Sequence, residues 1–151
     1  MNSAGNSQHL VDWYSFTHLI HGFLLYALFH LVDRRRVDRR RKLPAGLRLV
    51  LAVAIEAAWE IVENAPSVIA RYRAATISLG YYGDSIVNSL SDTLFMVAGF
   101  VLAWRLPVPA VVALALVLEG FLGWAIRDNL SLNVIMLIHP IDAIKAWQAG
   151  A

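Results

Sequence analysis

Four stretches of the chain are apolar over a length that suits a bilayer-crossing helix, which needs roughly 20 mostly apolar residues. Pro44 and Pro66 bound the second stretch, Gly83 precedes the third, and Pro107 opens the fourth. A later segment, about residues 132–148, has too short an apolar run to cross and predicts an interfacial or re-entrant helix. The predicted spans are residues 15–32, 45–64, 84–106 and 108–126. We therefore predict an all-α integral membrane bundle of four transmembrane helices plus a C-terminal interfacial helix, in one domain over residues 1–151.

The overall composition agrees with a membrane location. Of the 151 residues, 58% are hydrophobic and 16% are charged, whereas a soluble domain carries about 25% charged residues. Cysteine is absent from the sequence, which leaves no disulfide or thiolate metal site within it. The basic run from Arg34 to Lys42 lies between two apolar segments, so it predicts a solvated loop and not a nucleic-acid surface.

The same basic run predicts the orientation, because it holds seven of the thirteen lysines and arginines. Basic loops stay on the cytoplasmic side, so residues 34–42 are expected to be cytoplasmic. Both termini and the loop 65–83 are then expected to be periplasmic. Aromatic residues fall at the predicted outer boundary, as an interfacial belt would. They are Trp13, Tyr14, Tyr72, Tyr81, Tyr82, Trp124 and Trp147.

Polar residues recur at helical spacing inside the first three predicted spans. Spacings of three, four or seven residues place the members of each set on one helix face. The three sets are His18 and His21, then Glu56, Glu60 and Glu63, then Asp84, Asn88 and Asp92. With about 1.5 Å of rise per residue and the predicted orientation, all three sets lie in the outer half of the membrane. Glu119 of the fourth span falls at a similar depth.

The free-energy cost of placing these charged side chains in lipid determines which way they face. A charged side chain at the centre of a membrane helix costs roughly 2.5–3.5 kcal/mol even on lenient scales. The side chains are therefore expected to face inward, either as a hydrogen-bonded core that only holds helices together or as a functional cleft open to the periplasm. We favour the cleft, because the polar residues are concentrated on one side of the membrane. Its candidate catalytic residues are Glu56, Glu60, Asp84, Asn88 and Asp92.

Histidine beside carboxylates also raises the question of a cofactor. Imidazole and carboxylate ligands suit zinc and other divalent ions. His18 and His21 are therefore candidate ligands of a divalent metal together with Glu60, Glu63 or Asp84, and we take His18, His21 and Glu63 as the candidate set. In a hydrolytic reaction a buried carboxylate would act as general base, with the histidines as ligands or proton shuttles.

The remaining polar residues have two interpretations each. Arg71 and Arg73, in the predicted outer loop, either hold a lipid phosphate or form an exposed pair. Together with Asp128, at the end of the fourth span, they are the candidate substrate-binding residues. Glu119 is either a protonated core acid or a member of the site.

Four stretches of the sequence, together covering most of the chain, carry a resemblance. They are "NSQHLVDWYSFTHLIHGFLLY", "EAAWEIVEN", "RYRAATISLGYYGDSIVNSLSD" and "IRDNLSLNVIMLIHPIDAIKAWQ". In these the chain resembles a bacterial family of small multi-pass inner-membrane proteins classed as uncharacterised. The resemblance implies a bacterial inner-membrane location and brings no established activity. Family members usually have one further hydrophobic segment and a short cysteine-containing stretch ahead of the position of "NSQH", whereas this chain starts at Met1 without them.

A looser similarity links the acidic residues to VanZ-like proteins, which are associated with glycopeptide-antibiotic resistance. Those proteins have an intramembrane Glu followed by an Asp and an Asn at the start of the next helix. Glu56 or Glu60 would match the first, and Asp84, Asn88 and Asp92 the second. The stretch "VNSLSDTLFMVAGF" is also faintly similar to the Asn-x-x-Asp helix of lipoprotein signal peptidases, but the rest of that pattern is missing.

Three functions fit the pattern of polar residues. The first is an intramembrane enzyme or binding protein that acts on a lipid-linked or envelope substrate. The second is a non-catalytic accessory or scaffold subunit of a membrane complex, and the third is an ion or small-solute carrier. The expected partners are membrane lipid together with either a lipid-linked substrate or another membrane protein, and no nucleic acid.

Overall fold

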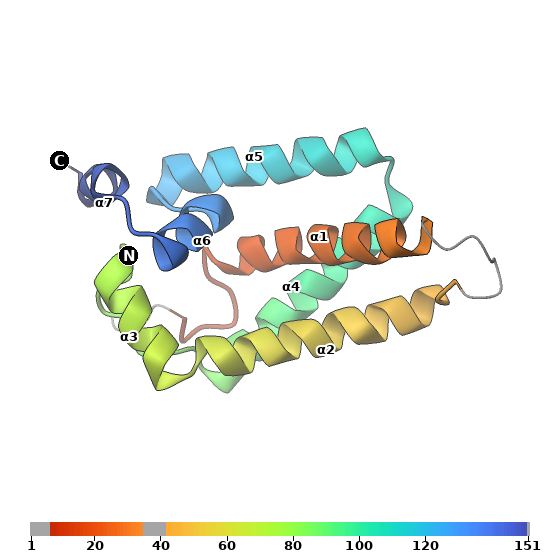
Figure 1. Ribbon diagram of the computed structural model, residues 1–151, viewed down its shortest axis with the longest axis horizontal. Helices are drawn as coiled ribbons and strands as arrows, with labels where there is room; N and C mark the ends of the chain where they lie inside the picture. Colours follow the sequence, from red (N-terminus) through yellow and green to blue (C-terminus); the bar gives the residue numbers. More distant parts are fainter. Residues whose placement is uncertain (1–6, 35–41, 151) are drawn as a thin grey trace.

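The computed structural model describes residues 7–34 and 42–150, and within these ranges all regular secondary structure is helical, with no strand. The helices are α1 (Ser15–Arg34), α2 (Ala45–Glu63), α3 (Pro66–Ala75), α4 (Ile86–Arg105), α5 (Val108–Ile126), α6 (Leu130–Ile138) and α7 (Asp142–Ala149). The predicted all-α fold is confirmed. Long helices α1, α2, α4 and α5 form the bundle, and short helices α3, α6 and α7 gather at one end of it (Figure 1). Most of the basic run of residues 34–42 lies outside the described residues.

Three of the described helices, α1, α4 and α5, are long and apolar enough to cross a membrane. Large apolar side chains such as Leu24, Leu94 and Leu116 are exposed on these helices. Contiguous exposed apolar surface is rare on soluble monomers, so the surface of the bundle agrees with a membrane protein. Helix α2 is of similar length but carries Arg48 and three glutamates.

Capping side chains fix the N-terminal ends of two of the long helices, α1 and α4. Asp12 Oδ1 accepts hydrogen bonds from the backbone N–H groups of Tyr14 and Ser15, at 2.8 and 3.1 Å, just before α1. Ser85 Oγ accepts from the backbone N–H of Asn88, at 3.1 Å, at the start of α4. These bonds satisfy N–H groups that have no partner inside the helix. They also fix where the polar residues of both helices begin.

Helices α1 and α4 make the most extensive contact in the bundle, and two glycines make it close. A Cβ atom added to Gly22 would clash with the backbone of Met96, and one added to Gly99 would clash with the carbonyl of Leu19. Small residues allow backbones to approach closely where helices cross. His18 lies one turn before Gly22, and Asp92 two turns before Gly99, so the close crossing brings both side chains to the same interface.

Two segments differ from the sequence-based expectation. The predicted outer loop at 65–83 contains α3, which starts at Pro66 because proline is well suited to the first turn of a helix. The segment expected to form one interfacial helix at 132–148 is two short helices, α6 and α7. The break falls at Pro140, whose ring lacks the N–H that a continuous helix needs.

Candidate functional site

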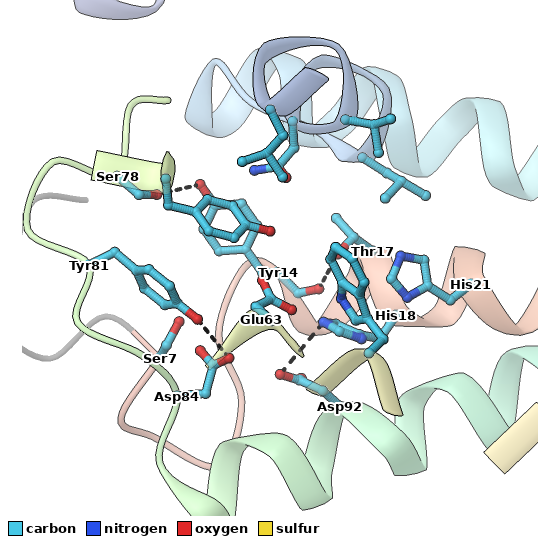
Figure 2. Close-up of a pocket in the computed structure, with 16 residues that line it drawn as sticks. Ser7, Tyr14, Thr17, His18, His21, Glu63, Ser78, Tyr81, Asp84 and Asp92 are labelled. Atoms are coloured by element: carbon cyan, nitrogen blue, oxygen red, sulfur yellow. Dashed lines mark hydrogen bonds and ion pairs between the residues drawn. The ribbon is translucent and has the colours of Figure 1, made fainter. Parts of the chain in front are cut away.

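A cavity of about 200 Å³ lies at the end of the bundle where α1 and α4 begin and α2 ends. Helix α6 and the segment after α3 close its other side (Figure 2). One wall carries acids and histidines, and the opposite wall, from α6, carries Leu130, Val134 and Leu137 with a single polar side chain, Asn133. The cavity therefore presents two chemically distinct walls.

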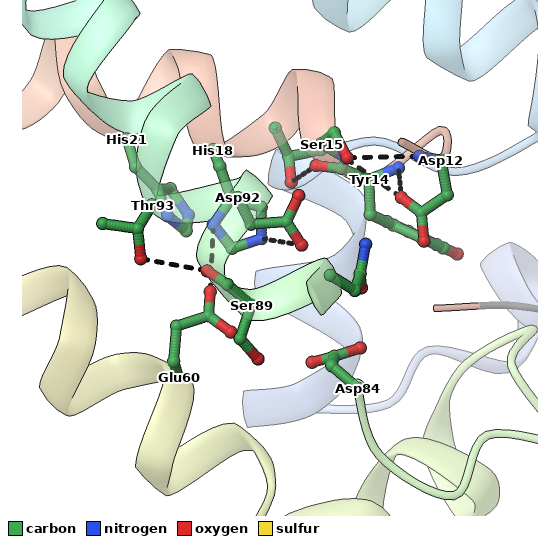
Figure 3. A network of polar contacts seen from close by, with 12 residues as sticks. Asp12, Tyr14, Ser15, His18, His21, Glu60, Asp84, Ser89, Asp92 and Thr93 are labelled. Carbon is green, nitrogen blue, oxygen red and sulfur yellow. Dashed lines mark hydrogen bonds and ion pairs between the residues drawn. The ribbon is translucent and has the colours of Figure 1, made fainter. Parts of the chain in front are cut away.

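His18 is the centre of the polar wall and faces three carboxylates from two other helices. Its Nδ1 lies 2.6 Å from Glu56 Oε1 and 3.5 Å from Glu60 Oε1, and its Nε2 lies 3.8 Å from Asp92 Oδ2. Figure 3 shows His18 of α1 between Glu60 of α2 and Asp92 of α4. The exposed fractions of Glu56, Glu60 and Asp92 are 2%, 5% and 3%. All three helices therefore contribute to one buried cluster.

Glu56 holds both histidines at once. Its Oε1 lies 2.6 Å from His18 Nδ1 and 3.1 Å from His21 Nδ1, and the two imidazole rings are 4.8 Å apart. Neither Glu56 nor Glu60 lines the cavity, whereas His18, His21 and Asp92 do. The Glu56 carboxylate thus lies behind the histidines and fixes the orientation of both rings.

Glu63 and Asp84 form the part of the polar wall that lies nearer the end of the bundle. Tyr81 donates a hydrogen bond from its hydroxyl to Asp84 Oδ2 at 2.9 Å, and the Asp84 backbone N–H donates to Asn64 Oδ1 at 2.7 Å. Burial raises the pKa of Asp84, and burial with the nearby Glu63 raises the pKa of Tyr72. The tyrosines therefore stay protonated and can donate hydrogen bonds into the cavity.

Several carboxylate oxygens in the cluster accept no hydrogen bond, although they are buried. They are both carboxylate oxygens of Glu60, Oε2 of Glu63 and Oδ1 of Asp92. No Lys or Arg lies among the described residues that line the cavity. Buried carboxylates usually have partners, because removing an unpaired charge from water is costly. The cluster thus has unused acceptor capacity and an excess of negative charge if the acids are ionised.

Among the candidate catalytic residues, the structure brings Glu56, Glu60 and Asp92 together around His18 and places Asp84 nearby. Asn88 is the exception. Its Nδ2 donates to the carbonyl of His9 at 3.1 Å, which ties the N-terminal segment to the start of α4. Asn88 does not line the cavity.

The candidate substrate-binding residues lie outside the cavity. Arg71 donates to the Leu137 carbonyl at 2.9 Å, at the C-terminus of α6, and Arg73 donates to the Tyr81 carbonyl. Asp128 is completely buried and accepts from the Tyr14 hydroxyl at 3.0 Å and from Gln148 Nε2 at 3.2 Å. A cation beside the last carbonyls of a helix stabilises it, so Arg71 joins α3 to the end of α6. Asp128 joins the segment before α1 to α7.

Glu119 also lies apart from the cluster. Its two carboxylate oxygens accept from the backbone N–H groups of Leu130 and Ser131, at 2.9 and 3.1 Å. These are the first residues of α6, where a negative side chain is favourable. Glu119 therefore caps α6 and folds it back along α5, which positions the apolar wall of the cavity.

Sequence reasoning missed the tyrosines of the site. Tyr72 and Tyr81 are buried, and Tyr14 is partly buried, instead of lying in an interfacial belt. All three line the cavity. Their only signal in the sequence is position near the end of a span, which belt and cavity residues share.

The cluster contains three groups of side chains whose ligand atoms lie within 4.8 Å of one another, as a bound metal requires. The groups are His18–His21–Glu56, His18–Glu60–Asp92 and Glu60–Glu63–Asp84. The predicted ligand set of His18, His21 and Glu63 is not one of them. Instead, the structure pairs His21 with Glu56 and Glu63 with Asp84.

Fold and site together define an all-helical protein with three helices able to cross a membrane and a buried acid–histidine cluster beside a cavity. The chain belongs to the family described as "Protein of unknown function (DUF2585)", whose model matches residues 1–150. The resemblance to an uncharacterised bacterial family is thereby confirmed. The looser similarity to VanZ-like proteins stays a prediction.

Relatives in several bacteria are similar over almost the whole chain. A UPF0314 protein of Sinorhizobium fredii and one of Rhizobium meliloti are each 61% identical over 150 residues, which is 99% of this chain and 73% of the relative. A UPF0314 protein of Novosphingobium aromaticivorans is 53% identical over 150 residues, or 99% of this chain and 75% of the relative. No solved structure matches the chain.

Proposed function

We propose that this chain is an intramembrane enzyme or binding protein of the bacterial inner membrane, which takes a lipid-linked or envelope substrate into its cavity. The observation that carries the proposal is the division of the cavity into a polar wall around His18 and an apolar wall from α6. Ligand sites are typically apolar clefts with a few convergent polar groups. A substrate with a polar head and an apolar chain would match both walls.

The proposal includes α2 as a fourth membrane span. Glu56 and Glu60 are buried on one face of α2, whereas Val50, Ile55 and Ile61 are exposed on other faces. This partition keeps the acids away from lipid, where each would cost roughly 2.5–3.5 kcal/mol at the helix centre. Helix α2 could then cross the membrane in spite of its charges.

The proposed orientation places the cavity and both termini on the periplasmic side. The cavity lies at the opposite end of the bundle from the C-terminus of α1 and the N-terminus of α2, which flank the basic run in the sequence (Figure 1). Since the chain has no cysteine, single cysteines can report the orientation directly. In spheroplasts, whose inner membrane is intact, a membrane-impermeant thiol reagent should label Leu79→Cys and spare Val37→Cys. The reverse result would contradict the orientation.

The test of the function compares lipids and envelope precursors in a strain lacking the gene and in strains complemented by variants. His18→Gln and Asp92→Asn should fail to restore the wild-type profile while the proteins remain folded and inserted. His30→Gln is the matched control, because His30 lies on the same helix but is exposed and outside the cavity. A deletion strain with an unchanged profile would overturn the proposal.

A second candidate function, a scaffold subunit, is favoured by one observation. The 2.6 and 3.1 Å contacts of Glu56 with His18 and His21 would hold α1 on α2 without any ligand. A scaffold should lose function only in proportion to stability. Glu56→Gln that loses stability and function in parallel would support the scaffold, whereas lost function at full stability would support the cavity.

A further inference from the structure

We infer that His18, Glu60 and Asp92 bind one divalent transition-metal cation at the base of the cavity, with Glu56 as the residue that orients His18. This inference deepens the proposed function. It rests on that function in one respect only, namely that the cation would lie where the polar head group of a substrate enters. Nitrogen and oxygen ligands in this combination suit zinc, manganese or ferrous iron.

The ligand geometry comes from three different helices. One atom each of His18, Glu60 and Asp92 lies within 4.8 Å of the others, and all three residues are buried. The 3.8 Å between His18 Nε2 and Asp92 Oδ2 is too long for a hydrogen bond. Two ligands about 2.0–2.2 Å from a tetrahedral zinc ion lie roughly 3.3–3.6 Å apart. A cation between these two atoms needs only a small adjustment of both side chains, whereas the Glu60 carboxylate, whose Oε1 is 3.5 Å from His18 Nδ1, has to turn toward Nε2.

Glu56 supplies the support that a metal-bound histidine commonly has. A ligating imidazole usually donates its other N–H to a carboxylate, which fixes the ring and the tautomer. Glu56 Oε1 lies 2.6 Å from His18 Nδ1, so with a cation on Nε2 this nitrogen would carry the proton and donate it to Glu56. The lone pair of Nε2 is then directed toward Asp92, on the side where the cation would lie.

An independent observation is the lack of hydrogen bonds at the proposed ligands. Asp92 Oδ1 and both carboxylate oxygens of Glu60 accept none, although the two residues are 3% and 5% exposed. Figure 2 shows Asp92 directed toward His18 at the floor of the cavity. Burying such oxygens unpaired is costly, and a divalent cation would satisfy them together. No Lys or Arg among the described lining residues can do so.

The neighbouring group of Glu60, Glu63 and Asp84 shares one carboxylate with this site but contains no histidine. Asp84 there accepts the Tyr81 hydroxyl at 2.9 Å, and Glu63 and Asp84 are only half-buried. The observations thus point to the group of His18, Glu60 and Asp92, which combines greater burial, a histidine and an orienting carboxylate.

The test titrates the purified full chain in detergent, after chelator treatment, with Co²⁺ and then with competing Zn²⁺. One equivalent of Co²⁺ should bind with visible absorption that Zn²⁺ removes. His18→Gln, Glu60→Gln and Asp92→Asn should abolish saturable binding, and Glu56→Gln should weaken it about 10- to 100-fold. His30→Gln and Asp142→Asn are matched controls at exposed positions and should bind as the wild type does.

Folded wild-type protein that binds no Co²⁺ or Zn²⁺ at millimolar concentration would overturn the inference, as would wild-type affinity in His18→Gln. X-ray absorption of the zinc-loaded wild type needs no variant and should show one imidazole with oxygen ligands. Two imidazoles or none would also overturn it. Metal binding with unchanged envelope lipids in the deletion strain would count against the proposed function alone. Altered lipids without metal binding would count against this inference alone.

Discussion

Asp92 in α4 and Asp128 after α5 are both buried aspartates, but their surroundings differ. Asp128 accepts hydrogen bonds from the Tyr14 hydroxyl, Gln148 Nε2 and the backbone N–H of Asn129, at 3.0, 3.2 and 3.0 Å. Asp92 has one carboxylate oxygen without any hydrogen bond, and its other oxygen lies 3.8 Å from His18 Nε2. One carboxylate is thus saturated by the protein, and the other retains acceptor capacity beside a cavity.

The glutamates repeat the difference. Glu119 uses both oxygens to accept from the first N–H groups of α6, whereas Glu60 accepts no well-formed hydrogen bond and has His18 Nδ1 at 3.5 Å from its Oε1. Saturated acids join segments that are distant in the sequence, since Asp128 contacts Tyr14 before α1 and Gln148 in α7. Burial of a carboxylate alone therefore does not mark a site. Burial together with unused acceptors and a cavity does.

The largest expected effect on folding comes from a change that separates α1 from α4. These two helices carry His18 and Asp92, so the cluster around His18 would be lost with their contact. Gly99→Leu puts a side chain into the backbone of Leu19, where even a Cβ atom clashes, and strain of this kind costs about 1–3 kcal/mol or more. We expect little folded, monodisperse protein by size-exclusion chromatography in detergent. Gly120→Leu is the matched control, because a Cβ atom at Gly120 meets nothing within 4 Å. Equal behaviour of the two variants would contradict the close crossing of α1 and α4.

The helices and the meeting of His18, Glu56 and Asp92 could be predicted from the sequence for a physical reason. Helical spacing fixes which residues share a face, and the cost of charge in lipid turns that face inward. Gly22 and Gly99 carry a signal that the sequence analysis did not use, because small residues within apolar helices permit close crossing. What the sequence could not supply is which acids face the cavity and which lie behind it.

The missed features depend on contacts without any periodic pattern. Asn88 has the spacing of a site residue, yet it binds the carbonyl of His9, which belongs to an irregular segment. Arg71 has the chemistry of a phosphate ligand, yet it caps α6. In both cases the partner is a backbone carbonyl, whose position follows from the tertiary fold and not from residue identity.

The next prediction removes a saturated carboxylate. Asp128→Ala leaves the Tyr14 hydroxyl and the Gln148 amide without their acceptor in a buried place, which should destabilise the protein by about 1–3 kcal/mol. Thermal denaturation in detergent measures the loss, and Co²⁺ affinity should stay at the wild-type value in the folded fraction. Weakened Co²⁺ binding of folded Asp128→Ala would mean that the two regions are not separate.

A smaller effect of the opposite sign is expected at Asp92. Asp92→Asn replaces an incompletely paired buried carboxylate by a neutral amide of the same shape, so the metal-free protein should be as stable as the wild type or about 1 kcal/mol more stable. Stabilisation by added Zn²⁺ should disappear, because the amide is a poor ligand. Thermal denaturation with and without Zn²⁺ gives both results. A marked loss of stability without metal would place Asp92 with Asp128 as a structural acid.

The smallest expected effect is a change in how stability depends on pH. Burial, followed by the nearby Glu119, raises the pKa of Asp128 above its ordinary value of 3.8, although Tyr14, Asn129 and Asn133 lower it in part. In the interval between 3.8 and the raised pKa, the folded state binds more protons than the unfolded state.

The stability that Asp128 contributes is therefore complete below pH 3.8 and is lost as the pH rises through the raised pKa. Asp128→Asn has no such proton to lose, so its melting temperature should fall less steeply than that of the wild type as the pH rises above about 4. The exposed Asp142→Asn variant should follow the wild-type slope. A steeper fall for Asp128→Asn would mean that Asp128 is held as a carboxylate by its three hydrogen-bond donors, with a pKa below its ordinary value. The contrast with Asp92 would then rest on charge as well as on hydrogen bonding, because the saturated acid would be the ionised one.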